Sequence, residues 1–445
     1  MRISRNSWWV LGVLTTIYAY SWLDRQVIVM LVDPIKHELG LDDLAMSLVL
    51  GPAFGLCYVL FGIPLGWAAD RYDRRWTIFF GVLIWSIATT ATGFASSLTA
   101  LFAMRLMVAV GEAALTPAAH SLLADNFPRN RLNTAMAVYS ASPKVGISAA
   151  YALGGLLIAA LVSREISLGA FWGDLTPWRQ VFILVGIPGP ILALLVLTFK
   201  EPARQAEAES NRFGFFSYMW LHRGLFMPLL FGFCAVSIPS VALQAWVPTY
   251  MGRQFGWSPE HYGPLIGLIS GVSAFAVVLK GGVVDWLYNR GINDAPLRFY
   301  TWLLVVFTPV AAVAFLLSDP VAFLILYGLV QIVAIPYGLY MATSVQMVTP
   351  RAFRARASAA TLLAGNLVSM TFGPTIVAFL TDIVFKDPGK LGSSLAVVTV
   401  CGMGTALLLL RYSLPKYGAM LKSFDGDPKA EQSDMSVEGR HVAKA

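Results

Sequence analysis

The chain has 445 residues, of which 57% are hydrophobic and 13% are charged, whereas a soluble globular protein carries roughly a quarter charged residues. This composition excludes an ordinary soluble domain, which has no use for so much apolar sequence. The net charge of +7 does not indicate a nucleic-acid partner, because the basic residues lie in short connections between apolar blocks and therefore carry a topology signal.

The apolar blocks are about twenty residues long, which is the length that a helix needs to cross a bilayer. They are apolar on all faces, whereas barrel strands would alternate over about ten residues. The sequence therefore predicts an all-α integral membrane protein with twelve transmembrane helices in two pseudo-symmetric six-helix bundles. The predicted spans are residues 8–32, 46–69, 76–96, 98–124, 132–161, 179–199, 224–251, 261–284, 298–317, 320–345, 357–384 and 391–412.

The predicted spans divide the chain into two halves. Residues 1–200 form the first bundle and residues 224–413 the second, with a cytoplasmic connection at 201–223 and a polar tail at 414–445 that we expect to be disordered. With the amino terminus in the cytoplasm, connections on that side hold 22 Lys and Arg residues and those opposite hold 6. The positive-inside rule then predicts that both termini are cytoplasmic and that the chain lies in the plasma (inner) membrane.

Two short repeats relate the halves. Residues 128–129, before the fifth span, recur as residues 350–351 before the eleventh, and residues 66–70 have a weaker copy at 281–285. Parallel repeats of six spans are typical of rocking transporters, whose substrate site lies near the midplane between the halves.

A glycine followed by acidic and basic residues forms the strongest motif, in the connection between the second and third spans. A glycine permits close helix approach, an acid can meet the positive end of a helix, and arginines can pair with acids or lipid phosphate. The motif resembles the signature of the major facilitator superfamily, with Asp73 replacing the usual glycine before the basic pair. We expect a conformational gating role for Gly66, Asp70, Arg71, Arg74, Arg75 and, in the weaker copy, Asp285.

Three charged residues within predicted spans of the first half are candidates for proton coupling: Asp24, Arg105 and Glu112. A separation of seven puts Arg105 and Glu112 on one helical face. Asp24 and Arg105 lie at similar depths, so we expect them to form an ion pair if their helices are neighbours. A buried carboxylate favours its protonated form and a nearby arginine favours the ionised form, so movement of the arginine would change proton affinity. The alternative is a static network that serves only packing.

The second half has neutral polar residues where the first half has charges, so we expect it to supply the opposite wall of a substrate site. Each aromatic in this set has a competing interpretation as core or as part of an interfacial belt. Lys280, near the inner end of its span, is expected to snorkel. The substrate-binding candidates are Arg25, Lys144, Gln244, Trp246, Tyr337, Tyr340 and Asn366.

Within the superfamily, residues 20–25 and 110–113 resemble the Spinster family, as do 122–128, 178–182 and 200–202. This resemblance implies an amphipathic substrate such as a lysophospholipid or a sphingoid phosphate. The anion:cation symporter family, which takes up sugar acids, also has an aspartate and arginine in the first span and an arginine-to-glutamate spacing of seven in the fourth. A proton symporter for small organic anions therefore remains the alternative.

Other classes of function fit less well. A membrane-embedded enzyme would need a nucleophile with its base or a metal cluster, and the sequence has no such motif, so we expect no enzymatic activity, cofactor or metal. A channel fits the repeated halves and the charged trio less well than alternating access does. The expected partners are a small-molecule or lipid substrate, protons and membrane lipids, and a monomer is expected to suffice.

Overall fold

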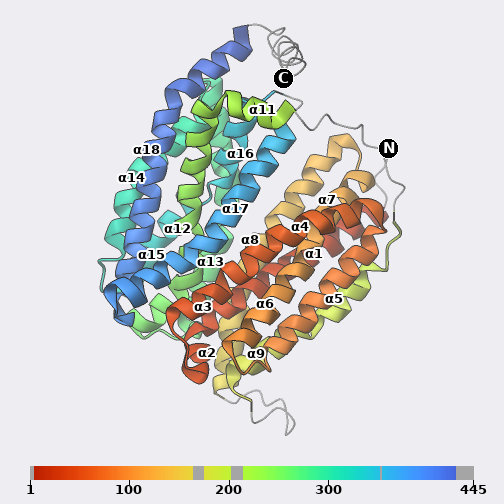
Figure 1. Cartoon of the computed structure of the whole chain (residues 1–445), viewed down its shortest axis with the longest axis vertical. Coiled ribbons are helices and arrows are strands. Elements are labelled where there is room, and N and C mark those ends of the chain that lie inside the picture. Colours follow the sequence, from red (N-terminus) through yellow and green to blue (C-terminus); the bar gives the residue numbers. More distant parts are fainter. Residues whose placement is uncertain (1–4, 164–174, 202–213, 351–352, 427–445) are drawn as a thin grey trace.

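A computed structural model of the chain describes residues 5–163, 175–201, 214–350 and 353–426. Helices dominate these ranges, which contain no strand, and the helices gather into two bundles (Figure 1). The start of the first described helix and the end of the last lie at one end of the molecule, here named the termini end. Helices α2 (Val32–Leu39) and α9 (Pro177–Gly186) lie at the opposite end, named the far end.

The first half contains eleven helical elements in its described ranges. They are α1 (Arg5–Val27), η1 (Ile28–Leu31), α2 (Val32–Leu39), α3 (Asp43–Leu50), α4 (Pro52–Arg71), α5 (Arg74–Thr92), α6 (Leu98–Ala113), α7 (Leu115–Asn126), α8 (Arg129–Val162), α9 (Pro177–Gly186) and α10 (Pro188–Val196). The second half has ten in its described ranges. They are α11 (Gly214–Leu221), α12 (Arg223–Phe255), α13 (Pro259–Asn289), α14 (Ala295–Ala314), α15 (Pro320–Val333), α16 (Gly338–Met347), α17 (Arg354–Phe379), η2 (Leu380–Phe385), η3 (Pro388–Lys390) and α18 (Leu391–Gly426).

Each of the twelve predicted spans is occupied by helix, which confirms the predicted fold class. Several spans consist of two helices, because the chain breaks at Gly51, at Ala114, before Pro188 and around Pro336. Proline removes a backbone donor, so it begins a new helix more easily than it continues one. In the described part of the chain, ten helices are long and apolar enough to cross a membrane. The other two spans are less apolar, because α1 is rich in Trp, Tyr and Thr and α5 begins with two arginines.

Two segments differ from the sequence prediction. Residues 214–221, expected within a polar connection, form the short helix α11. The last helix, α18, continues to Gly426, so the beginning of the predicted disordered tail is helical. Residues 202–213 of the predicted connection, 427–445 of the predicted tail, and 351–352 of the second repeat lie outside the described ranges.

Tight helix contacts join the two halves toward the far end. Helix α8 packs along α13, and α3 and α4 pack against α17. At Gly155 a Cβ would meet the carbonyl oxygen of Pro259, and at Gly263 it would meet that of Tyr151. Glycine is needed at these points because a side chain would push the two backbones apart. The far end is therefore the closed end of this conformation.

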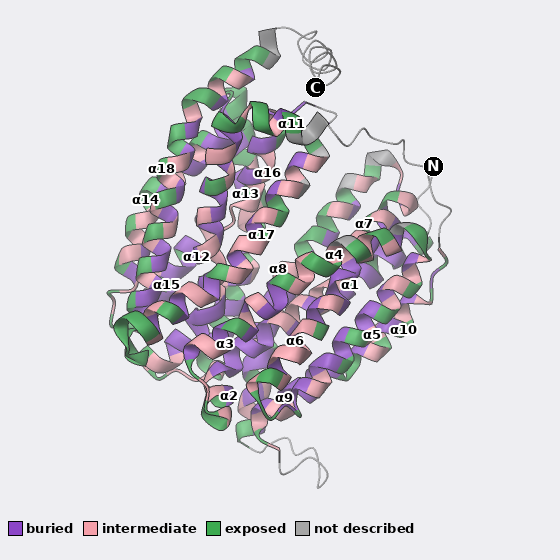
Figure 2. Cartoon of the chain, in the orientation of Figure 1, coloured by how far each residue is buried: buried purple, intermediate pink, exposed green. Residues whose placement is uncertain are grey.

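Buried residues line the inside of each bundle, and exposed residues cover its outer surface (Figure 2). Many of the exposed side chains are large and apolar, for example Leu316, Phe275 and Leu408, which are 81%, 75% and 71% exposed. An apolar surface of this extent needs a hydrocarbon surrounding. The outer faces of the helices therefore face lipid.

Candidate functional site

The charged cluster of the first half is built around an ion pair between Arg25 and Glu112. Arg25 lies in the last turn of α1, and Glu112 lies at the end of α6, one residue before that helix ends. The Nε and Nη2 atoms of Arg25 each lie 2.5 Å from Oε2 of Glu112. The two side chains are 9% and 1% exposed. This paired charge is therefore almost completely withdrawn from solvent.

Three aromatic rings surround the guanidinium of Arg25. Its Cζ atom lies 4.2 Å from the ring centroid of Phe54, 4.7 Å from that of Trp22 and 5.0 Å from that of Tyr58. The faces of these rings attract a cation and replace part of its lost hydration. The rings therefore allow a buried guanidinium to keep its charge next to a single carboxylate.

Arg105 contacts the backbone of α1 rather than an acid. Its Nη2 donates to the carbonyl oxygen of Arg25 at 3.1 Å. That carbonyl lies where α1 changes into the 3-10 turn η1, and carbonyl groups at such a change of helix type lack their usual α-helical donor. Arg105 thus fixes the backbone of the residue whose side chain holds Glu112.

The expected ion pair between Asp24 and Arg105 is wrong. In the described part of the chain Asp24 forms no ion pair, and its Oδ2 accepts from the hydroxyl of Thr89 on α5. Successive residues of a helix point about 100° apart, so when Arg25 faces α6 its neighbour Asp24 must face elsewhere. Matching the two residues by depth alone ignored this rotation.

The cluster keeps unused hydrogen-bonding capacity. Within the described residues, Oδ1 of Asp24, Oε1 of Glu112 and Nε of Arg105 are buried without a hydrogen-bond partner. A buried polar atom without a partner costs free energy, so such atoms mark places where something else binds. A proton on a carboxylate and an anionic group on an arginine both fit these positions.

Polar and aromatic side chains continue from the cluster toward the termini end. The hydroxyl of Tyr58 lies 3.3 Å from that of Thr116, and the ring of Tyr18 stacks on Tyr139 with centroids 4.6 Å apart. The ring of His120 meets Tyr139 edge to face at 5.5 Å. The first half therefore offers hydroxyl and imidazole groups on the termini side of Glu112.

Two of the predicted substrate aromatics belong to the core of the second half. Trp246 is fully buried and its Nε1 donates to the carbonyl of Pro374 at 3.0 Å. Tyr340 is fully buried and stacks on Tyr300 at 4.7 Å. These side chains pack the bundle, so the competing interpretation as core holds for this conformation.

The remaining substrate candidates are more accessible. Tyr337 lies at the break between α15 and α16, Asn366 is exposed on α17, and Lys144 is partly exposed on α8. The part of Gln244 with a described contact is its carbonyl oxygen, which accepts from Gln26 at 3.3 Å. These four residues are therefore not buried in the core as Trp246 and Tyr340 are.

A polar bridge that the sequence did not predict connects the charged cluster to the second half. Gln26, the residue after Arg25, donates to the hydroxyl of Tyr151 at 2.7 Å, and that hydroxyl donates to the carbonyl of Gln244 at 3.1 Å. The sequence offered one signal for this bridge: Gln26 is a neutral polar residue that directly follows Asp24 and Arg25 within the first predicted span. A path of hydrogen bonds therefore links the residue next to Arg25 to α12.

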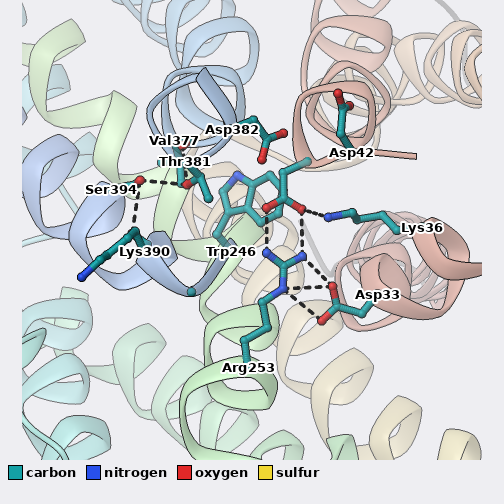
Figure 3. A network of polar contacts seen from close by, with 12 residues as sticks. Asp33, Lys36, Asp42, Trp246, Arg253, Val377, Thr381, Asp382, Lys390 and Ser394 are labelled. Atoms are coloured by element: carbon teal, nitrogen blue, oxygen red, sulfur yellow. Dashed lines mark hydrogen bonds and ion pairs between the residues drawn. The ribbon is translucent and has the colours of Figure 1, made fainter. Parts of the chain in front are cut away.

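A second network of charges ties the halves together at the far end (Figure 3). Arg253, near the end of α12, makes two hydrogen bonds to the carboxylate of Asp43, at 2.7 and 2.8 Å. It also binds Asp33 on α2, the shorter contact being 2.6 Å. Lys36 completes the network by binding Oδ1 of Asp43, which also accepts from Arg253. One arginine of the second half is therefore held by two acids of the first.

A further far-end contact crosses between the halves a few residues away. The backbone N–H of Leu44 donates to Oδ2 of Asp382 in η2 at 2.8 Å. The sequence did not predict these far-end contacts between the halves. One feature of the sequence did point to these contacts. Lys36 and Arg253 are two of only six basic residues in the connections opposite the amino terminus, and each lies close to the end of a predicted span.

The termini-end motif is organised around Arg74. Its side chain is 1% exposed, and it binds Asp125 on α7 at 2.5 Å and Glu201 after α10 at 2.6 Å. Arg75 binds Asp73 and donates to the carbonyl of Phe199 at 2.9 Å. The hydrogen bonds from Arg75 hold the pKa of the Asp73 carboxyl, which lies between α4 and α5, below its usual value. The motif thus joins three segments of the first half.

The other residues of the motif make fewer contacts than Arg74 and Arg75. The guanidinium of Arg71 lies 5.4 Å from the ring centroid of Trp67, and Gly66 approaches Pro117 of α7. Asp285, the copy in the second half, is exposed on α13. The side chain of Asp70 lies outside what the structure describes.

The sequence profile of the Major Facilitator Superfamily matches residues 14–374. The chain belongs to this superfamily. It is therefore an integral, multi-pass membrane protein of a transporter superfamily. Its sequence is 28% identical to an MFS-type efflux pump of Mycolicibacterium smegmatis, over 94% of this chain and 92% of the pump.

Other relatives belong to both groups that the motifs indicated. The chain is similar to a crystal structure of a bacterial homolog to the human lysosomal transporter Spinster in an inward-facing, unoccupied conformation, with a TM-score of 0.76 and 27% identity over 95% of this chain and 98% of that one. It is also 27% identical to the probable galactarate/D-glucarate transporter GudP of Bacillus subtilis, over 64% of this chain and 66% of that protein. The predicted likeness to Spinster proteins is confirmed, together with a likeness to sugar-acid carriers.

Proposed function

We propose that this superfamily member is a proton-coupled secondary transporter that works by alternating access and carries an amphipathic anion, such as a lysophospholipid or a sphingoid phosphate. The observation that carries the proposal is the buried Arg25–Glu112 ion pair, with Glu112 only 1% exposed. Charges inside membrane-spanning helices are costly and mark substrate, ion or proton pathways. The adjoining bridge through Gln26 to α12 gives this pair a direct connection to the other half.

The cycle follows from the contacts of the pair. A proton on Glu112 removes the negative charge that holds Arg25. The guanidinium is then free to bind a phosphate or carboxylate, which it does with two parallel hydrogen bonds. Arg105 meanwhile keeps the backbone of Arg25 in place. When the substrate leaves and the proton is lost, the pair forms again.

The aromatic surroundings of the pair favour an amphipathic substrate. Phe54, Trp22 and Tyr58 present rings beside the cation, so an anionic headgroup and the first carbons of an acyl chain would find a charge and an apolar wall together. The likeness to the bacterial Spinster homologue, which spans 95% of this chain, supports the same substrate class.

A proton symporter for sugar acids is the second candidate. It is favoured by the likeness to GudP and to the D-galactonate transporter of Escherichia coli, to which this chain is 27% identical. A sugar carboxylate would use the same Arg25 cation. The two candidates therefore differ in what surrounds the anion, and a panel of substrates separates them.

We further propose that the termini end faces the cytoplasm of the inner membrane and that a single copy transports substrate. The orientation rests on the excess of Lys and Arg in the connections at that end. A reporter enzyme that is active only in the cytoplasm, fused after the carboxyl terminus, should be active. Activity of a periplasmic reporter in its place would reverse the orientation.

The test uses purified protein in liposomes that contain a pH-sensitive dye. An inward pH gradient is applied with lysophospholipids, sphingoid phosphates or sugar acids, and internal pH and substrate flux are recorded together. We expect saturable proton movement with an amphipathic anion, and its loss in Glu112→Gln, which keeps an oxygen for Arg25 but cannot bind and release a proton.

Glu260→Gln, an exposed acid at the far end of the second half, is the matched control and should behave as wild type. Proton movement driven by sugar acids alone would transfer the assignment to the second candidate. Substrate flux with no proton movement in wild type, or full coupling in Glu112→Gln, would exclude the Arg25–Glu112 pair as the coupling group.

A further inference from the structure

The short helix α11 lies at the termini end, with one face against the protein and the other face open (Figure 1). Tyr218 belongs to the inner face, because it is buried and its hydroxyl donates to the carbonyl of Val348 at 3.0 Å. The next residues but one, Trp220 and Leu221, turn away from that contact and are 63% and 67% exposed. Helix α11 therefore leaves an apolar outer face exposed.

Two basic side chains border this face, and each lies against an aromatic ring. The guanidinium of Arg223 lies 5.1 Å from the ring centroid of Trp220. The ammonium of Lys416, on α18, lies 4.3 Å from the ring centroid of Tyr412 and 3.0 Å from its hydroxyl. Lys416 also donates to the carbonyl of Gly224 at 3.1 Å, which joins the two pairs because Gly224 directly follows Arg223. The basic-aromatic patch is defined as Trp220, Leu221, Arg223, Tyr412 and Lys416.

The basic-aromatic patch continues the lipid-facing surface of the second half. Leu408, one turn before Tyr412 on α18, is exposed, and so is Phe231, two turns after Gly224 on α12. These apolar side chains place the hydrocarbon layer on the side of the patch that faces away from the termini. Trp and Tyr are enriched at the level of the lipid headgroups, because their rings are apolar and their tips polar. The patch therefore lies at the boundary between membrane and water.

The charges of the patch are complementary to an anionic lipid. Within the described residues, neither Arg223 nor Lys416 forms an ion pair. Basic residues at a membrane surface attract anionic headgroups. We propose that the basic-aromatic patch binds an anionic phospholipid of the bilayer, with the phosphate held by Arg223 and Lys416. Its acyl chains then lie along Trp220 and Leu221. This lipid is not the transported substrate, so the inference does not depend on the proposed function.

The bound lipid acts on the helices that lie behind the patch. Tyr218 connects α11 to Val348, the residue that follows α16 and precedes α17. Lys416 connects α18 to the start of α12. Helix α17 in turn packs against α3 and α4 of the first half. A lipid held between α11 and α18 therefore stabilises the termini end of the second half, where the chain arrives from the first.

Lipid contact is measured on the full-length carrier in phosphatidylcholine liposomes that contain a small fraction of brominated lipid. Bromine quenches tryptophan fluorescence on contact, and subtraction of the same protein with Trp220→Leu isolates the signal of Trp220. Brominated phosphatidylglycerol is compared with brominated phosphatidylcholine. The variants are Arg223→Gln combined with Lys416→Gln, and Arg223→Lys. Lys390→Gln, an exposed lysine at the far end, is the matched control.

We expect wild type and Lys390→Gln to favour brominated phosphatidylglycerol at Trp220 by roughly tenfold, because two basic residues face the headgroup. The double variant should lose this preference, since both charges are gone. Arg223→Lys keeps the charge and should retain it. In wild type the preference should weaken as salt is added, because salt screens exposed charges.

Equal quenching by the two lipids in wild type would assign Trp220 to an ordinary aromatic belt and overturn the site. A preference that survives in a folded double variant would overturn it too. If the double variant does not fold, the salt series decides, since a wild-type preference that salt leaves unchanged contradicts a charged contact. The measurement uses neither a substrate nor a proton gradient, so its outcome is independent of the transport assay.

Discussion

The two charge networks of the molecule are built on opposite plans. The Arg25–Glu112 pair lies within one half, is enclosed by aromatic rings and leaves carboxylate oxygens without partners. The network around Arg253 joins both halves, because this arginine of the second half contacts two acids of the first. The first is the pair that we propose to exchange protons, and its contacts lie within one half. The second must break before the far end opens, which makes it a gate rather than a coupling group.

Removing the cation from the buried pair should have the largest effect. Arg25→Ala leaves Glu112 without a partner, and breaking a buried pair in this way costs about 3 kcal/mol or more. We expect a lower thermal unfolding temperature and no proton-driven uptake. Arg25→Lys keeps the charge but loses planar contact with the rings, so it should recover most of the stability. Wild-type unfolding in Arg25→Ala would show that the pair is not a structural unit.

Removing the cation of the far-end network should change conformation more than stability. Arg253→Gln loses charged hydrogen bonds between the halves, worth about 2 kcal/mol, which corresponds to roughly 30-fold in favour of the far-end-open state. Distance measurements between spin labels on the two halves at the far end should report this shift. An unaltered distance distribution would mean that the glycine contacts alone keep this end closed.

Gly155→Ala tests those glycine contacts directly. The added Cβ meets the carbonyl oxygen of Pro259, so the same opening is expected at a smaller cost of about 1 kcal/mol. Gly404→Ala is the matched control, because its Cβ meets nothing within 4 Å and alanine favours a helix. Equal label distances in the two variants would contradict the close contact between α8 and the start of α13.

The smallest expected effect concerns Glu38 on α2, outside the spans. Burial acts to raise its pKa, but hydrogen bonds from Thr176, Trp178 and Arg179 outweigh it and hold the pKa below its usual value. The stabilisation is therefore complete above the unfolded pKa of about 4.3 and is lost as pH falls through the lower folded value. Glu38→Gln should lower the unfolding temperature slightly at pH 7, with a difference from wild type that vanishes in acid. A constant difference at every pH would rule out this linkage.

Much of this fold could be predicted, because the position of a membrane span depends on the length and polarity of a single segment. The twelve spans and the unusual charges within them follow from that pattern. Contacts between segments do not. The partner of Arg25 depends on the rotation of α1, and Trp246 and Tyr340 face the core because of how α12 and α16 turn within their bundle. The Arg253 gate joins residues about 210 positions apart, which no local pattern records.

The Arg74 network described at the termini end has a mechanical consequence. The buried guanidinium of Arg74 connects the start of α5 to α7 and to Glu201 after α10. A force applied to any one of these segments is therefore transmitted to the others. In a force experiment on a single molecule, this part of the first half should come out of the membrane in one step rather than helix by helix. Arg74→Gln should divide that step, which would make the first half a less rigid lever for any movement that begins at Glu112.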